Sequence, residues 1–210
     1  VYAEGSTTDK LQMSASIEYP TAHVNPQVLA ALQQLVMSST LGKPAEGISA
    51  EQAVSDWMDE LEEEYVAENR YFLSSEAEEE VRSTFSAENK VIGKVYSLSD
   101  GTMSYQVLSY VYAGGAHGLA TTSFTVVDLH EGRVLTEKDI FPGVSDVELA
   151  RMLREAFVAQ KGTSEEELIE RGFEVDAIYP NTNFYLNADS VVFVFNPYDI
   201  APYAEGEQRI

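Results

Sequence analysis

The feature that most constrains the fold is a series of β-prone segments in the middle of the chain. Four segments rich in valine, isoleucine, tyrosine, phenylalanine and threonine occupy residues 81–86, 91–98, 103–112 and 120–129. Turn-forming residues follow the later segments, at Ser99-Asp100-Gly101, in a glycine-rich stretch after residue 112, and at Glu131-Gly132. Consecutive strands joined by short turns predict an antiparallel meander.

Further strands are predicted toward both ends of the chain. Residues 11–19 alternate apolar and polar side chains, which is the pattern of a half-buried strand. Residues 184–186 precede a turn at 187–189 and the run 191–195, which is apolar on both faces and therefore predicts a central strand. We expect residues 198–206 to leave the sheet as a proline-containing tail.

Three longer segments have the spacing of amphipathic helices. Asn25 followed by Pro26 predicts the first helix start, and the pairs Ser49 with Gln52 and Ser145 with Glu148 predict capping boxes for the other two. A shorter acidic helix is predicted near residues 164–171. The expected buried stripes are Val28, Leu29, Leu32, Leu35 and Val36; Trp57, Met58, Leu61 and Tyr65; and Leu149, Met152, Leu153, Ala156 and Phe157.

Together these elements predict an α+β fold. We expect an antiparallel or mixed sheet with packed helices, arranged as two closely associated subdomains. The second helix carries a strongly acidic face, which we interpret as a solvated surface: Asp56, Asp59, Glu60, Glu62, Glu63 and Glu64.

The charge of the chain restricts its partners. Lys and Arg number 13 against 35 Asp and Glu, which gives a net charge of −22. Such a surface repels phosphate backbones, so we predict no nucleic-acid partner. It attracts cationic proteins. The alternative explanation of the charge is that it only keeps the protein soluble. Cysteine is absent, which excludes disulfides, a thiol nucleophile and thiolate metal sites. No apolar run approaches the roughly 20 residues that span a bilayer, and we expect membrane attachment only through an anchor that this chain lacks.

The most distinctive motif runs from Tyr110 to Gly118. An alternating aromatic strand leads into Gly114 and Gly115, and His117 follows within the same motif. Glycine permits positive φ and a close approach of other groups, so the motif places His117 on a bent ridge. Such a ridge serves either a binding site or a turn whose histidine bonds only to the backbone.

No pattern of catalytic or metal-binding residues accompanies this histidine. A Gly-x-Ser-x-Gly elbow, a calcium loop and a phosphate-binding Gly-Lys-Ser/Thr sequence are all missing from the sequence, and His23, His117 and His130 lack the spacing of zinc ligands. We therefore predict no catalytic residue, no metal and no cofactor. Paired carboxylates for glycoside hydrolysis stay open, because any acidic chain contains many pairs.

Several blocks of sequence resemble a family of bacterial extracytoplasmic modules of PdaC type and RsiV type. The blocks, which cover residues 12–206 in the family's order, are Tyr112-Ala-Gly-Gly-Ala-His-Gly118, Phe124-Thr-Val-Val-Asp128, Gly132-Arg-Val-Leu135, Asp139-Ile-Phe141 and Phe193-Val-Phe-Asn-Pro-Tyr-Asp-Ile-Ala-Pro-Tyr-Ala-Glu-Gly206. The resemblance implies an α+β module of unassigned function, secreted or lipid-anchored in a precursor. It also implies a PdaC-like part at residues 1–133 and an RsiV-like part at residues 134–210.

The resemblance further implies a partner. One member of the family, the RsiV anti-sigma factor, binds lysozyme, a strongly cationic enzyme, through its RsiV-type region. In another, the PdaC peptidoglycan deacetylase, the catalytic domain is separate from the PdaC-type region. We therefore expect a non-enzymatic, extracytoplasmic binding module, periplasmic or on the cell surface, for lysozyme, another cationic protein or a peptidoglycan component. The expected contact residues are Tyr112, Gly114, Gly115, His117, Tyr198 and Tyr203. The alternatives are a cell-wall glycan or peptide hydrolase that uses carboxylates near His117, and an assembly module with a large exposed apolar patch.

Overall fold

The computed structural model describes residues 1–8, 10–74, 86–99 and 101–210. The chain divides into two compact units. Unit 1 comprises Val1–Lys94 and Val107–Ala120, and unit 2 comprises Val95–Gln106 and Thr121–Ile210. Three strands contribute residues to both units: β3 (Ala87–Ser99), β4 (Thr102–Tyr112) and β5 (Leu119–Asp128). The proposed division at residue 133 stays a prediction.

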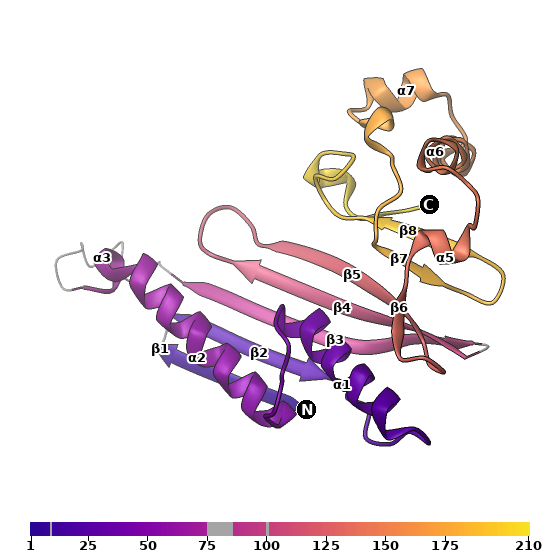
Figure 1. Ribbon diagram of the computed structural model, residues 1–210. Helices are drawn as coiled ribbons and strands as arrows, with labels where there is room; N and C mark the ends of the chain where they lie inside the picture. Colours follow the sequence, from indigo (N-terminus) through magenta and orange to yellow (C-terminus); the bar gives the residue numbers. More distant parts are fainter. Residues whose placement is uncertain (9, 75–85, 100) are drawn as a thin grey trace. The chain divides into compact units, whose positions relative to one another are not determined.

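Unit 1 combines one region of a sheet with helices (Figure 1). Its strands are β1 (Tyr2–Thr8), β2 (Leu11–Ile17), the first part of β3, the last part of β4 and the start of β5. Its helices are α1 (Pro26–Leu41), α2 (Ala50–Glu68) and the short α3 (Arg70–Leu73). Strand β2 pairs antiparallel with β1 and parallel with β3, so the sheet is mixed. Alternate residues of β2 are buried, as the period-2 pattern predicts, and α2 packs against β1 and β2.

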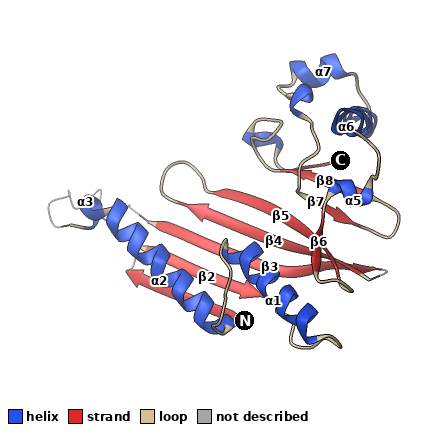
Figure 2. Cartoon of the chain, in the orientation of Figure 1, coloured by secondary structure: helices blue, strands red, loops and turns tan. Residues whose placement is uncertain are grey.

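Unit 2 contains the later strands and the C-terminal helices (Figure 2). The chain continues through β5 (Leu119–Asp128), β6 (Arg133–Leu135), α5 (Glu137–Ile140), α6 (Asp146–Lys161), α7 (Glu165–Glu170), η1 (Val175–Ala177), β7 (Phe184–Leu186), β8 (Val191–Phe195), η2 (Tyr203–Glu205) and β9 (Gln208–Arg209). Strands β1 to β6 follow one another in the order of the sequence, and β7, β8 and β9 form a second sheet with β8 in the middle. The central position predicted for residues 191–195 is therefore confirmed.

The core of unit 2 is rich in phenylalanine. Phe157 and Phe173 meet edge to face with ring centroids 5.4 Å apart, and Phe184 lies 5.4 Å from Phe193. Two further rings, Phe124 and Tyr185, lie 4.6 Å apart in a neighbouring cluster with the buried Val194. These side chains supply the apolar area whose removal from water stabilises the unit.

Several details differ from the predictions. Strand β1 was not predicted, because its sequence has no regular apolar alternation. Both predicted capping boxes are half-formed. The serine of each accepts a bond from the backbone N–H three residues on, but Gln52 donates to Asp56 at 2.6 Å and Glu148 binds Arg151. Partners on the next turn of the helix compete with the reach back to the N-terminus. A complete box forms instead at α5.

The buried stripe of α6 is rotated from its predicted position. Leu149, Leu153 and Phe157 are buried as expected, but Met152 is 42% exposed and Ala156 is exposed, while Ala150 is buried in their place. Residues 198–206 lie outside the sheet, as predicted, and the chain returns to it just beyond them in β9. The predicted strand at 81–86 lies outside the described residues, except for its last position, which is not in a strand.

Candidate functional site

The glycine-rich motif forms the connection between β4 and β5 in unit 1. Gly114 and Gly115 both have positive φ, 87° and 94°, a conformation that costs other residues roughly 1–2 kcal/mol each. Half-buried Tyr112 closes the turn, because its hydroxyl donates to the carbonyl of Gly115 at 3.2 Å. The glycines of the motif are therefore explained by backbone conformation.

The histidine of the motif is exposed at the end of this turn. Nδ1 of His117 donates to the carbonyl of Gly118 at 3.0 Å. Gly118 is buried beneath the phenol ring of Tyr110, and a Cβ at position 118 would come within 2.4 Å of the Tyr110 hydroxyl oxygen. Gly118 thus permits the ring of Tyr110 to lie directly on the backbone.

Replacing Gly118 with alanine is expected to lower the free energy of unfolding of unit 1 by about 1–3 kcal/mol, because the added methyl group must displace the Tyr110 ring. Trp57, the single tryptophan, lies in α2 and reports unfolding of this unit by its fluorescence. In a Tyr110→Ala background the same substitution should cost much less. An equal cost in both backgrounds would show that the ring is not the obstacle.

The other two predicted contact residues belong to unit 2. Tyr198 is 61% exposed and has positive φ, 76°, an uncommon conformation for a bulky side chain. Its ring lies 5.6 Å from that of Tyr203. The structure therefore brings Tyr112, Gly114, Gly115 and His117 together in unit 1, and pairs Tyr198 with Tyr203 in unit 2.

The sequence block around this tyrosine pair has structural contacts of its own. The side chain of Asn196 accepts a bond from the Thr122 N–H at 2.7 Å and donates to the Thr122 carbonyl at 3.1 Å. Asp199 accepts from the Asn196 N–H at 2.7 Å, and Ile200 is 1% exposed in the core. This part of the motif is accounted for by folding.

A pocket adjoins the glycine-rich turn in unit 1. It has a volume of about 230 Å³ and lies where the last turns of α2 meet β2, β3 and the end of β4. The residues that line it are Leu11, Leu61, Glu64, Tyr65, Glu68, Asn69, Ala87, Glu88, Asn89, Val111, Tyr112 and Ala113. The pocket thus joins the predicted contact residue Tyr112 to the acidic helix α2.

The charges around this pocket come mainly from α2. Glu64 and Glu68 are exposed and lie four residues apart, on the same side of the helix. The last turn of α2 contains no basic residue. Its C-terminal end therefore adds the partial negative charge of the helix dipole to the two carboxylates.

The signal for this pocket was only partly visible in the sequence. Leu61 and Tyr65 were predicted on the buried stripe of α2, and Glu64 on its acidic face. Glu68 and Val111 were missed, because no local pattern shows that the end of β4 lies beside the end of α2.

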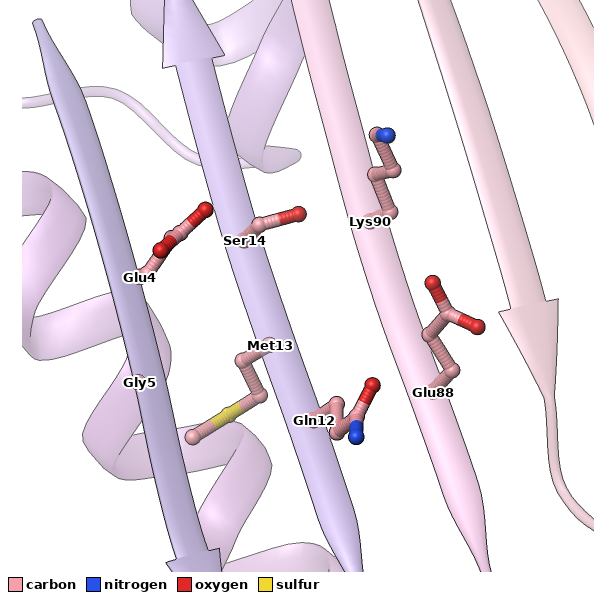
Figure 3. Close-up of a pocket in the computed structure, with 7 residues that line it drawn as sticks. All are labelled: Glu4, Gly5, Gln12, Met13, Ser14, Glu88 and Lys90. Atoms are coloured by element: carbon pink, nitrogen blue, oxygen red, sulfur yellow. The ribbon is translucent and has the colours of Figure 1, made fainter.

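A second hollow, of about 510 Å³, lies on the first three strands of unit 1. Figure 3 shows Glu4, Gln12, Ser14, Glu88 and Lys90 along one face of these strands, with the helices behind the sheet. Lys90 aligns with Ser14 and Ser14 with Glu4 across the three strands. The hollow is open and polar, which is the usual state of a solvated sheet face.

The described residues contain neither a cluster of metal ligands nor a membrane-spanning helix. No group of three or more histidine, aspartate or glutamate side chains in this part of the chain is arranged to hold a metal ion. Within the residues that the structure describes, none of the helices has the length and apolar character to cross a bilayer.

Comparison with known proteins gives matches in both parts of the chain. A family model described as deacetylase PdaC matches residues 6–120, and one described as a protein of unknown function (DUF3298) matches residues 138–210. No curated protein matches the chain.

Two solved structures are similar to this one. The crystal structure of a DUF3298 family member from Bacteroides fragilis has a TM-score of 0.90 at 24% identity, over 100% of this chain and 87% of that one. A DUF3298 family protein from Pseudomonas aeruginosa has a TM-score of 0.62 at 16% identity, again over 100% of this chain and 87% of that one. At these identities the similarity shows the α+β fold alone. Because the PdaC model matches more than half of the 210 residues and the DUF3298 model matches the C-terminal part, the chain belongs to the PdaC family and carries a DUF3298 region.

Proposed function

We propose that this chain is a non-enzymatic, extracytoplasmic binding module of the bacterial cell envelope, and that its ligand is a strongly cationic protein such as lysozyme. The observation that carries the proposal is the acidic surface of α2 beside the glycine-rich turn. Asp59, Glu60, Glu63, Glu64 and Glu68 are all exposed on this helix. Within the described residues, the carboxylates of α2 form one ion pair, between Lys43 and Glu60.

The carboxylates lie beside exposed apolar side chains. A shallow hollow of about 520 Å³ on α2 is lined by Asp59, Glu62, Glu63, Val66, Ala67 and Arg70. Val66 is 40% exposed, and the exposed rings of Tyr71 and Phe72 meet edge to face at 5.5 Å. Three carboxylates against the single Arg70, next to apolar and aromatic groups, suit a cationic protein surface, because the excess negative charge steers the encounter and the rings supply buried area.

The net charge of −22 supports the same ligand class. Charges attract a cationic partner over distances of about 8 Å at physiological salt, which accelerates encounter without fixing one complex. A specific complex should therefore persist at about 150 mM salt, where loose attraction is screened.

Titration calorimetry with lysozyme at about 150 mM salt is expected to show binding at tens of micromolar protein or below. Truncating a central aromatic contact typically costs at least 1–2 kcal/mol, so Tyr112→Ala should weaken the affinity by about tenfold or more. His117→Ala tests the second predicted contact, with an unchanged melting temperature required of both variants. Cytochrome c, a basic protein of unrelated fold, serves as the control ligand. The absence of heat with lysozyme would rule out lysozyme as the ligand, and equal binding of cytochrome c would show attraction by charge alone and not a specific complex.

The enzymatic alternative has one observation in its favour. Carboxylates cluster in a pocket beside the glycine-rich turn, where a glycan hydrolase would need them. However, a carboxyl group that acts as a general acid near neutral pH requires an apolar enclosure, and Glu64 and Glu68 are exposed to solvent. Deacetylation, which the family description names, is a second enzymatic reading.

Incubation with purified peptidoglycan separates these readings. Release of reducing ends, free amines or acetate that is lost in the double variant Glu64→Gln/Glu68→Gln would replace the binding proposal with a catalytic one. Co-sedimentation with peptidoglycan without product release, in the absence of lysozyme binding, would instead identify the wall itself as the ligand.

A further inference from the structure

We infer that the 230 Å³ pocket beside Tyr112 receives a single long cationic side chain, lysine or arginine, from the partner. The inference rests on the proposed function, since it names the group by which a cationic protein would be held. It adds a binding site with a defined chemistry to an otherwise general acidic surface.

The size of the pocket favours one side chain over a larger ligand. Pockets for drug-sized molecules generally measure about 300–1,000 Å³, whereas this one measures about 230 Å³. A glycan chain or a folded loop would exceed it. One extended side chain has the right scale.

The wall of the pocket suits the aliphatic part of such a side chain. Leu11 is 4% exposed and Tyr65 is 8% exposed, so both form the inner wall, while Leu61 is half-buried. Val111 is 44% exposed and offers apolar surface nearer the solvent. Lysine and arginine place their methylene groups against apolar surface of this kind and keep the charged end in water.

The rim of the pocket supplies the opposite charge. Glu64 and Glu68 line it from the last two turns of α2, and neither forms an ion pair within the described residues. The C-terminal end of the helix adds negative potential at the same place. A neutral aliphatic group would contact the apolar wall but would not pair with the carboxylates of Glu64 and Glu68. An anion would be repelled by both carboxylates.

The described lining of the pocket contains no cationic side chain. Among the residues that line it and that the structure describes, none is lysine or arginine. Glu88 also lines the pocket, but its carboxylate lies with Gln12 on the face shown in Figure 3, so the negative charge at the rim comes from the two glutamates of α2.

The experiment is an NMR titration of the protein with three small probes. The cationic probes are the N-acetyl methylamides of lysine and arginine, and the neutral probe is the N-acetyl methylamide of norleucine, which has a similar aliphatic chain without the charge. We expect the amide resonances of Glu68, Val111 and Ala113 to shift with at least one cationic probe. The norleucine probe should bind more weakly, and equal binding of all three would overturn the inference.

Two variants and a matched control complete the test. Because exposed ion pairs are individually weak, Glu64→Gln/Glu68→Gln should weaken binding of the cationic probe by about three- to tenfold. Asp59→Asn/Glu63→Gln removes the same charge at the same spacing on α2, outside the pocket, and should have little effect. Val111→Phe should fill the pocket and abolish binding. Equal losses in the pocket and control variants would show that charge alone acts, which overturns the site.

The same variants, used with lysozyme, separate the two proposals. If lysozyme binds wild type and Glu64→Gln/Glu68→Gln equally, the pocket inference is wrong and the proposed function stands. If the cationic probe binds in the pocket but lysozyme does not bind at all, the chemistry of the pocket is supported and the proposed partner is wrong.

Discussion

Replacing Phe193 with alanine is expected to lower the free energy of unfolding of unit 2 by about 3–5 kcal/mol, because the substitution leaves a cavity in the core as well as removing apolar contacts. Phe193 is 1% exposed in the central strand β8. Its ring lies 5.4 Å from that of Phe184 and 6.5 Å from that of Phe141. A loss of this size is a large share of the stability of an ordinary domain.

The measurement is chemical denaturation followed by far-ultraviolet circular dichroism, with Trp57 fluorescence recorded in the same samples as a report on unit 1. Tyr179→Ala is the control, since it removes an aromatic ring of unit 2 that is 43% exposed, and it should change stability by no more than about 0.5 kcal/mol. A cost below about 1.5 kcal/mol for Phe193→Ala would mean that the core collapses around the cavity or is less tightly packed than its geometry indicates.

Replacing Asn183 with alanine should be nearly as costly, at about 2–4 kcal/mol, although it removes only a small polar side chain. The side-chain oxygen of Asn183 accepts from the N–H of Phe124 at 2.7 Å, and its amide nitrogen donates to the carbonyls of Thr122 at 2.8 Å and Val194 at 3.2 Å. Phe124 is 4% exposed, so its N–H would lose its partner in a place that water reaches poorly.

The loss is large because the side chain of Asn183 supplies hydrogen bonds to backbone groups, as a neighbouring strand would. Together with the side chain of Asn196, it bonds backbone groups of Thr122 and Phe124 in β5, a strand that does not belong to the sheet of β7, β8 and β9. Thermal and chemical unfolding of Asn183→Ala, compared with the exposed control Asn187→Ala, would measure the effect. Asn183→Asp keeps the acceptor for Phe124 but sets a carboxylate oxygen against the Thr122 carbonyl, so it should not restore stability. Full stability in either Asn183 variant would contradict the assigned role.

Local sequence patterns predicted most of the individual elements. The alternation in residues 11–19 produced β2, Asn25 with Pro26 started α1, and the apolar run at 191–195 became the central strand β8. These signals are reliable because they depend on period, capping and burial on both faces, all of which are written in neighbouring residues.

Pairing between distant segments could not be predicted in the same way. Strand β1 has little apolar alternation and is a strand because the edge of β2 supplies its hydrogen bonds. The parallel pairing of β2 with β3 joins residues about 76 positions apart, and the sequence of neither segment identifies the other as its partner. For the same reason the bonds from Asn183 and Asn196 to β5 were invisible in the sequence.

The same distinction between local patterns and long-range packing applies to the candidate site. By itself the sequence determined the α+β class, the excess of negative charge, the acidic face of α2 and the glycine-rich turn with its contact candidates Tyr112 and His117. Only the tertiary structure decided that Leu61, Glu64, Glu68 and Val111 meet beside Tyr112 in one pocket. Periodicity shows which face of an element a side chain occupies, but a pocket depends on which faces of distant elements come together, and that is settled by packing of the whole unit.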